Sequence, residues 1–195
     1  MKTSKDYPQT EYTGIILAGG KSSRMGMDKG LVLYRGKPLI TYSINLLSPF
    51  CKRILLSASI VVYDHLGLER VTDEFNNYGP MAGLYSCLRK STTEINICLP
   101  CDVPEIPVEV IATLIEAAKE NPGKCIVPLT PLPEPLIAVY PLNVISVIEG
   151  LISRNEFKMT RIFDLFPVKY IPFEEFSLKD NKDIFMNINN RKDLR

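Results

Sequence analysis

The stretch TGIILAGGKSSRMGMDK, residues 13–29, indicates the fold class. It opens on a short run of β-branched and aliphatic side chains, which is typical of a strand buried on both faces. The run leads directly into Ala18, Gly19 and Gly20, so we expect the strand to end in a glycine-rich loop. Adjacent glycines let the backbone approach a ligand closely, and successive amide groups in such a turn form a concavity that binds anions.

The same loop then brings in positive charge. Arg24 can form paired hydrogen bonds with phosphate oxygens and Lys29 adds a point charge, so a polyphosphate is the natural partner for both. A glycine pair alone more often marks a solvated surface loop, but its coincidence with these cations after a strand favours a phosphate site. The loop has neither the Walker A pattern nor the Gly-x-Gly-x-x-Gly pattern of dinucleotide-binding proteins. We therefore predict a polyphosphate site of another kind.

Further short apolar runs recur along the chain. They occupy residues 53–57, 68–72, 94–99, 124–128, 136–140, 168–171 and 184–187. Helical periodicity is found at residues 38–47, 81–88, 108–118, 144–152 and 160–166, with a small extended excursion at 31–37. This pattern predicts an α/β protein with a mainly parallel central sheet and helices on both faces.

In such sheets ligands bind beyond the C-terminal ends of the strands, so the loops that follow strands are the candidate sites. Asp102 follows the apolar run 94–99, and a carboxylate there can hold Mg²⁺ while leaving positions for phosphate and water. The alternative is a helix N-cap ahead of Pro107. Asp73 lies in another loop that follows a predicted strand, and it is a second candidate carboxylate for the site. The adjacent Glu74 is the alternative to it.

The composition limits the classes of protein to which this chain can belong. The formal net charge is +1, from 23 basic and 22 acidic residues, which argues against nonspecific nucleic-acid binding. No segment has the apolar length of a membrane span or the character of a signal peptide. Five cysteines, an odd number with several in apolar runs, favour a reduced, cytoplasmic protein. We expect a single domain at residues 13–195 after a polar tail at residues 1–12.

Cys98 and Cys101 have the spacing of a redox or zinc motif. They lack further ligands, because His65 is the only histidine and is distant in the sequence. Burial at a strand end explains this pair better than a metal site does, and His65 is expected in a surface loop.

The glycine-rich loop also carries a resemblance that extends along the chain. The segments involved are residues 17–20, 24–26, 28–29, 36–39, 79–83, 100–104, 134–136 and 187–189, in this order. Together they closely resemble the molybdenum cofactor guanylyltransferases (the MobA family) of the nucleotidyltransferase superfamily. The resemblance spans Gly14 to about Leu194 and implies a three-layer, Rossmann-like nucleotidyltransferase fold.

This resemblance implies an enzyme that transfers GMP from GTP to the terminal phosphate of Mo-molybdopterin, releasing pyrophosphate, with Mg²⁺ as cofactor. Delivery of the product implies transient contact with cofactor-handling proteins or molybdoenzymes. A phosphate nucleophile is already anionic near neutral pH and needs no general base, which fits a chain with one histidine. Two alternatives stay open: a nucleotidyltransferase of the same fold that uses CTP or another acceptor, and a noncatalytic nucleotide-binding module.

The resemblance also implies roles for individual residues. Catalysis is expected to depend on Arg24, Lys29 and Asp102. The nucleotide is expected to contact Leu17, Ala18, Gly19, Gly20, Lys29, Ser57, Asp73, Gly79, Pro80, Gly83 and Asp102.

The metal is expected at Asp102 and Asn187, where Asn187 shares an Asn-x-Asn motif with Asn189 that fits a structural turn equally well. Ser57 stands where relatives can carry asparagine, so its contact with ribose or base is open. Lys158 and Arg161 either meet the pterin phosphate or are exposed helix charges.

Overall fold

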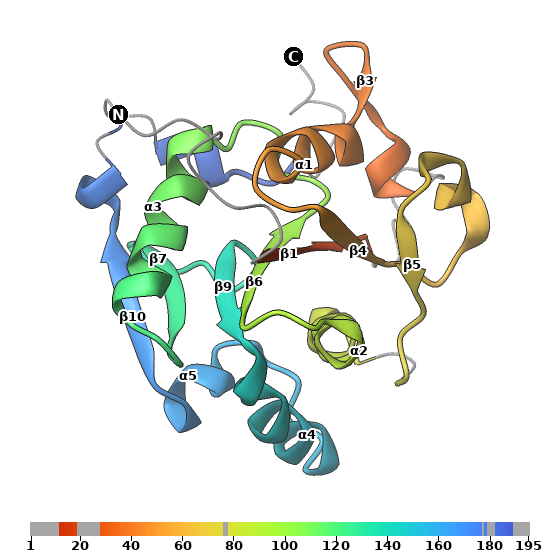
Figure 1. Ribbon diagram of the computed structural model, residues 1–195. Helices are drawn as coiled ribbons and strands as arrows, with labels where there is room; N and C mark the ends of the chain where they lie inside the picture. The colour runs from red at the N-terminus through yellow and green to blue at the C-terminus, as the bar shows by residue number, and fades with distance from the viewer. Residues whose placement is uncertain (1–11, 19–27, 76–77, 177, 179–181, 189–195) are drawn as a thin grey trace.

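The structure, a computed structural model, describes residues 12–18, 28–75, 78–176, 178 and 182–188 as a central sheet with helices on both faces (Figure 1). Within these residues the strand order is β10 (Val168–Pro172), β7 (Cys125–Thr130), β9 (Ala138–Pro141), β6 (Ile95–Pro100), β1 (Tyr12–Leu17), β4 (Arg53–Ser57) and β5 (Glu69–Val71). The short strand β8 (Leu132–Pro133) pairs with β7. The strands β2 (Leu33–Tyr34) and β3 (Lys37–Pro38) form a separate hairpin in the expected extended excursion.

Most neighbouring strands run parallel, which confirms the predicted class of sheet. β1 pairs in parallel with both β4 and β6, β4 with β5, and β7 with β10. Along this path β9 is the exception, because it runs antiparallel to β6 and to β7. The register places Leu17 opposite Ser57 on one side and Pro100 on the other. The C-terminal ends of these central strands therefore lie at the same edge of the sheet.

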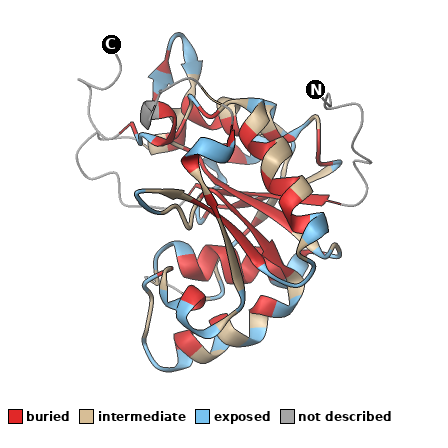
Figure 2. Cartoon of the chain, turned by 90° about the vertical axis from the view of Figure 1, so that its left-hand side faces the viewer, coloured by how far each residue is buried: buried red, intermediate tan, exposed pale blue. Residues whose placement is uncertain are grey.

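Helices cover the sheet as two outer layers, which gives the three layers that were predicted (Figure 1). One face carries α1 (Leu39–Leu47) and α3 (Val108–Glu120), and the other carries α2 (Pro80–Lys90), α4 (Ile145–Ser153) and α5 (Arg161–Leu165). Figure 2 shows the buried strands enclosed between these helices.

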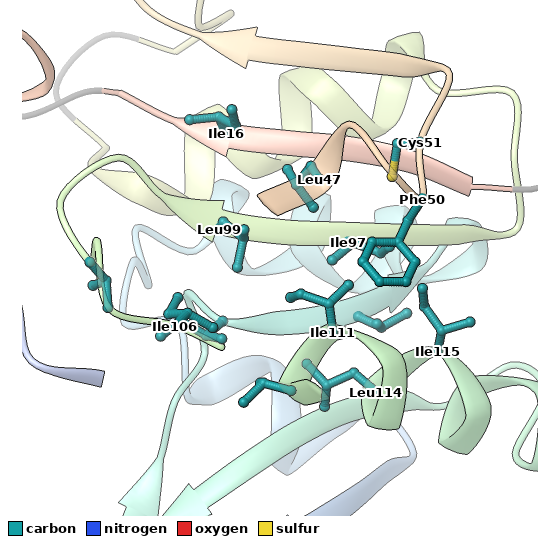
Figure 3. Packing of buried hydrophobic residues seen from close by; sticks show 14 of the residues in the cluster. Ile16, Leu47, Phe50, Cys51, Ile97, Leu99, Ile106, Ile111, Leu114 and Ile115 are labelled. Carbon is teal, nitrogen blue, oxygen red and sulfur yellow. The ribbon is translucent and has the colours of Figure 1, made fainter. Parts of the chain in front are cut away.

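Successive side chains of β1 point to opposite faces of the sheet, and each face has its own hydrophobic cluster. Ile16 packs in the cluster under α1 and α3, whereas Ile15 packs in the cluster under α2 and α4. Figure 3 shows the first cluster, where Ile111 and Ile115 of α3 lie close to Ile97 of β6. Burial of each such side chain stabilises the fold by about 1.5–3 kcal/mol.

The predicted strand at residues 184–187 is wrong. The structure has a 3₁₀ helix there, η7 (Lys182–Phe185). The Phe185 ring meets the rings of Phe173 and Phe176 edge-on, with centroids 6.3 and 6.2 Å away. The apolar character of this segment therefore reflects packing against the side of the core rather than strand pairing.

Another 3₁₀ helix, η4 (Val61–Leu66), was not predicted and joins β4 to β5. β1 begins at Tyr12, one residue earlier than expected, and the Tyr12 ring is buried. No helix in the described part of the chain is long and apolar enough to cross a membrane.

All five cysteines are free and buried. Cys98 packs in the cluster under α2, whereas Cys101 packs in the cluster on the opposite face of the sheet. The interpretation of these residues as core cysteines is confirmed. His65 is exposed on η4, where its Nδ1 lies 2.8 Å from the carbonyl oxygen of Val62.

Candidate functional site

Backbone hydrogen bonds tie together the ends of β4, β1 and β6. The Ala18 amide donates to the carbonyl oxygen of Ser57 (2.9 Å), and the Cys101 amide donates to that of Leu17 (3.2 Å). The Ala18 amide is therefore engaged with the neighbouring strand, and the expected contact of Ala18 with the nucleotide stays a prediction. Leu17 and Ala18 are also buried, so both align the strand ends.

An ion pair joins the glycine-rich loop to the end of β6. Lys29 begins the 3₁₀ helix η3 (Lys29–Leu31), and its ammonium group donates to Oδ2 of Asp102. The Lys29 side chain is 25% exposed and the Asp102 side chain 13% exposed, so both charges are shielded yet reachable from solvent. The structure thus brings together two of the residues expected to be catalytic, although they are 73 positions apart in the sequence.

Asp28 fixes the start of η3. Its Oδ1 accepts a hydrogen bond from the Gly30 amide (3.2 Å), and the Tyr63 hydroxyl donates to the same oxygen. Tyr63 lies on η4 and is buried. Burial, together with the hydrogen bond to Asp28, raises the pKa of the Tyr63 phenol. No sequence signal marked this tyrosine, because it becomes part of the site only through the packing of η4 on η3.

A second polar contact lies on the α2 side of the strand ends. The Ser57 hydroxyl donates to Oδ1 of Asp73, which follows β5, at 2.8 Å. Burial raises the pKa of the Asp73 carboxyl, and the hydrogen bond from Ser57 opposes this shift. Ser57 itself is buried, so its hydroxyl contacts Asp73 from the interior of the protein. The adjacent Glu74 is exposed and points elsewhere, since its Oε1 lies 3.8 Å from Nε of Arg89.

Gly83 acts through close packing. It is buried in α2, and a Cβ there would lie 3.1 Å from the Cβ of Ser57 and 3.2 Å from Cδ2 of Leu17. Gly83 is closely packed against Ser57 and Leu17, and its expected contact with the nucleotide stays a prediction. Gly79 and Pro80 are exposed at the start of α2, at the edge where a nucleotide contact was predicted.

Asn187 is exposed next to Ile188, whose amide donates to the carbonyl oxygen of Asp102 (2.9 Å). Asn187 is therefore the chain neighbour of a residue that contacts Asp102, the residue expected to hold the metal. In the described part of the chain, no group of three or more His, Cys, Asp or Glu side chains could hold a metal ion. Asp102 therefore offers one carboxylate, which fits an ion that also binds substrate phosphates.

Gly19, Gly20 and Arg24 lie outside the described residues, so their expected contacts stay predictions. Arg161 is engaged on the surface of α5, with Nε 2.9 Å from Glu156 and Nη1 2.6 Å from Asp164. Its partners favour the interpretation as an exposed helix charge.

A mainly parallel sheet that gathers a lysine and a carboxylate at its strand ends has the arrangement expected of a Rossmann-like nucleotidyltransferase. The chain belongs to the MobA-like NTP transferase family, since the family model described as "MobA-like NTP transferase domain" matches residues 14–165.

Individual relatives agree with this assignment. A probable molybdenum cofactor guanylyltransferase of Flavobacterium johnsoniae is 36% identical over 163 residues, covering 84% of this chain and 86% of that protein. A molybdenum cofactor guanylyltransferase of Campylobacter jejuni subsp. doylei is 30% identical over 181 residues, covering 92% and 91%. The crystal structure of molybdopterin-guanine dinucleotide biosynthesis protein A from Archaeoglobus fulgidus superposes with a TM-score of 0.80 at 26% identity, covering 93% and 94% of the two chains.

Proposed function

We propose that this chain transfers GMP from GTP to the terminal phosphate of Mo-molybdopterin and releases pyrophosphate. The product would be the guanine dinucleotide form of the molybdenum cofactor. Two relatives named as guanylyltransferases, which align over 84% and 92% of the chain, support this proposal.

The structural observation that carries the proposal is the ion pair between Lys29 and Asp102. It places a cation and a carboxylate together at the strand ends, next to the glycine-rich loop. Lys29 would neutralise negative charge on the triphosphate, together with Arg24 and the amides of Gly19 and Gly20. Interactions of this kind lower a barrier when they are already in place before charge develops.

The chemistry needs no proton acceptor from the protein. An oxygen of the acceptor phosphate would attack the α-phosphorus of GTP, the bond from that phosphorus to the β-phosphate oxygen would break, and pyrophosphate would leave. The single histidine of the chain, His65, is exposed on η4, which supports a mechanism without a histidine base. The contribution of the protein would then be positioning and charge stabilisation.

We also propose Mg²⁺ as the cofactor, held by Asp102 with Asn187 as the neighbouring donor. Carboxylate and amide oxygens suit Mg²⁺, which commonly takes one or two carboxylates and completes its shell with substrate phosphates and water. When bound, the ion supplies charge neutralisation at the phosphates. Lys29 would contact phosphate oxygens directly, whereas Asp102 would act on them through the ion.

The α2 side of the site would receive the nucleoside. Ser57 and Asp73 form a hydrogen-bonded unit there, and Gly79 and Pro80 begin the adjacent helix. An ionised Asp73 offers acceptors for sugar hydroxyls or base amino groups. Leu17 would form the floor between the two sides.

We place the reaction in the cytoplasm, with transient contacts to cofactor-handling proteins or molybdoenzymes that receive the product. The five free thiols of the chain are consistent with a reducing compartment.

The test is pyrophosphate release with Mo-molybdopterin and Mg²⁺ in parallel reactions containing GTP, CTP, ATP or UTP. We expect GTP to react fastest and mass spectrometry to detect the guanine dinucleotide product. Faster reaction with CTP would reject guanylyl transfer in favour of cytidylyl transfer. Absence of pyrophosphate, while an active guanylyltransferase turns over the same substrates, would indicate a nucleotide-binding module.

A further inference from the structure

We propose that Tyr63 is a positioning residue for nucleotidyl transfer, because it holds Asp28 and thereby keeps Lys29 directed at Asp102. The inference rests on the function proposed above for Lys29. Tyr63 lies on η4, in the connection between β4 and β5, outside every motif that the sequence presents.

The contact is made to the turn that begins with Lys29. Asp28 is the N-cap of η3, and its Oδ1 accepts from both the Gly30 amide and the Tyr63 hydroxyl. The turn continues with hydrogen bonds from the Leu31 amide to the Asp28 carbonyl oxygen (3.1 Å) and from the Val32 amide to that of Lys29 (3.2 Å). A side chain from η4 therefore anchors the backbone that carries the lysine.

Gly30 makes this contact possible. A Cβ at Gly30 would lie only 2.5 Å from the Tyr63 hydroxyl oxygen, so any side chain there would displace the phenol. Tyr63 is 1% exposed, which leaves its ring little freedom to find another partner. A tyrosine phenol is protonated at neutral pH, and burial raises the pKa of Tyr63 further, so it remains a hydrogen-bond donor.

The contact with Tyr63 also keeps the negative charge of Asp28 from competing with Asp102 for Lys29. Asp28 directly precedes Lys29, and a free carboxylate at that position would compete with Asp102 for the ammonium group. It would also add negative charge beside the triphosphate. Bound by Tyr63 and Gly30, the Asp28 carboxylate is instead directed into its own turn, and Lys29 pairs with Asp102.

The experiment is a double-mutant cycle of wild type, Tyr63→Phe, Lys29→Ala and the double variant. Turnover of GTP and affinity for inorganic tripolyphosphate, measured by calorimetry at fixed Mg²⁺, are the two readouts. We expect Tyr63→Phe to lower kcat/KM about 10-fold and to weaken tripolyphosphate binding several-fold, because it disturbs positioning. In the Lys29→Ala background the same change should have less than about a 2-fold effect, because the pathway through Lys29 is already removed.

Tyr42→Phe is the matched control. Its hydroxyl donates to the carbonyl oxygen of Tyr34 (2.7 Å), so this variant also loses one tyrosine hydrogen bond, but away from Asp28. It should retain wild-type affinity for tripolyphosphate. If Tyr63→Phe fails to fold, Gly30→Ala replaces it in the cycle, because the added Cβ displaces the phenol.

Equal losses from Tyr63→Phe in the wild-type and Lys29→Ala backgrounds would overturn the inference, as would wild-type affinity in Tyr63→Phe. A wild-type protein that releases no pyrophosphate would reject the proposed function instead. In that case the tripolyphosphate cycle still decides the role of Tyr63, because it requires no transfer reaction.

Discussion

Replacing Gly83 by alanine should both destabilise the protein and disturb the contact between Ser57 and Asp73. The added Cβ would lie 3.1 Å from the Cβ of Ser57 and 3.2 Å from Cδ2 of Leu17, and closer still to the Ser57 hydroxyl oxygen. Ser57 and Leu17 belong to central strands that are paired on both sides, so the backbone has little room to yield. Either α2 moves away from the sheet or Ser57 turns away from Asp73.

The magnitude follows from three terms. Overpacking of a buried site costs about 1–3 kcal/mol, and loss of the hydrogen bond between Ser57 and Asp73 costs about 1 kcal/mol. The better helix propensity of alanine offsets about 1 kcal/mol of this. The net loss of about 1–3 kcal/mol should lower Tm by about 2–12 °C for a chain of this size, and the KM for GTP should rise several-fold under the proposed function.

The assay is thermal unfolding followed by circular dichroism, with Gly150→Ala as the matched control. A Cβ at Gly150 in α4 meets only Nη1 of Arg154 at 3.8 Å, an ordinary contact at the end of a flexible side chain. The control should therefore gain stability, by up to about 1 kcal/mol, from helix propensity alone. Equal Tm changes in the two variants would refute the argument that close packing at Gly83 shapes this side of the site.

Three further predictions concern charge and reactivity. Lys29→Ala should fold cooperatively, with an unchanged far-ultraviolet spectrum, but lose at least about 10²-fold in turnover, the scale of removing one electrostatic donor; near wild-type turnover would contradict its role. Asp73→Asn should gain stability relative to wild type as the pH rises from below 3.8 to neutrality. Burial raises the pKa of Asp73 in the folded protein, so the wild type loses free energy of unfolding as the pH rises through that raised value, whereas the asparagine variant does not. Urea denaturation at several pH values measures this difference, and a pH-independent difference would exclude it. All five thiols should resist Ellman's reagent at pH 8 until guanidinium unfolds the chain, because all are buried and burial raises the pKa of Cys51 and Cys125 to about 12; rapid reaction of any thiol in the native protein would show that its environment opens.

Most strands and helices of the fold follow from local sequence patterns, and so does the edge of the sheet where the site lies. The apolar run that ends at Leu17 predicts β1, and Lys29 and Asp102 stand in loops that follow strands. Their pairing could not be predicted without the strand order, because it requires β6 to lie directly beside β1. The family resemblance indicates which residues are expected at the site, and the strand register determines which of these residues are neighbours.

Other features depend on packing that leaves no local signal. Tyr63 is one of nine tyrosines, and nothing in its sequence neighbourhood predicts that it reaches Asp28. The run that contains Ile184 and Phe185 has the composition of a strand, but the Phe185 ring packs against other aromatic residues. Short apolar runs at the side of a core are ambiguous in this way, because burial alone does not distinguish a strand from a turn of helix.

The hydrogen bond from the Ile188 amide to the Asp102 carbonyl oxygen has a consequence for protein synthesis. On the ribosome, the strands β1, β4, β5 and β6 emerge long before residue 188 does. A nascent chain can therefore pair these strands while Asn187 is still inside the exit tunnel. The side of the site proposed to bind the metal would be completed only after these strands have paired, so chains truncated before Ile188 should retain much of the sheet and lack this contact with Asp102.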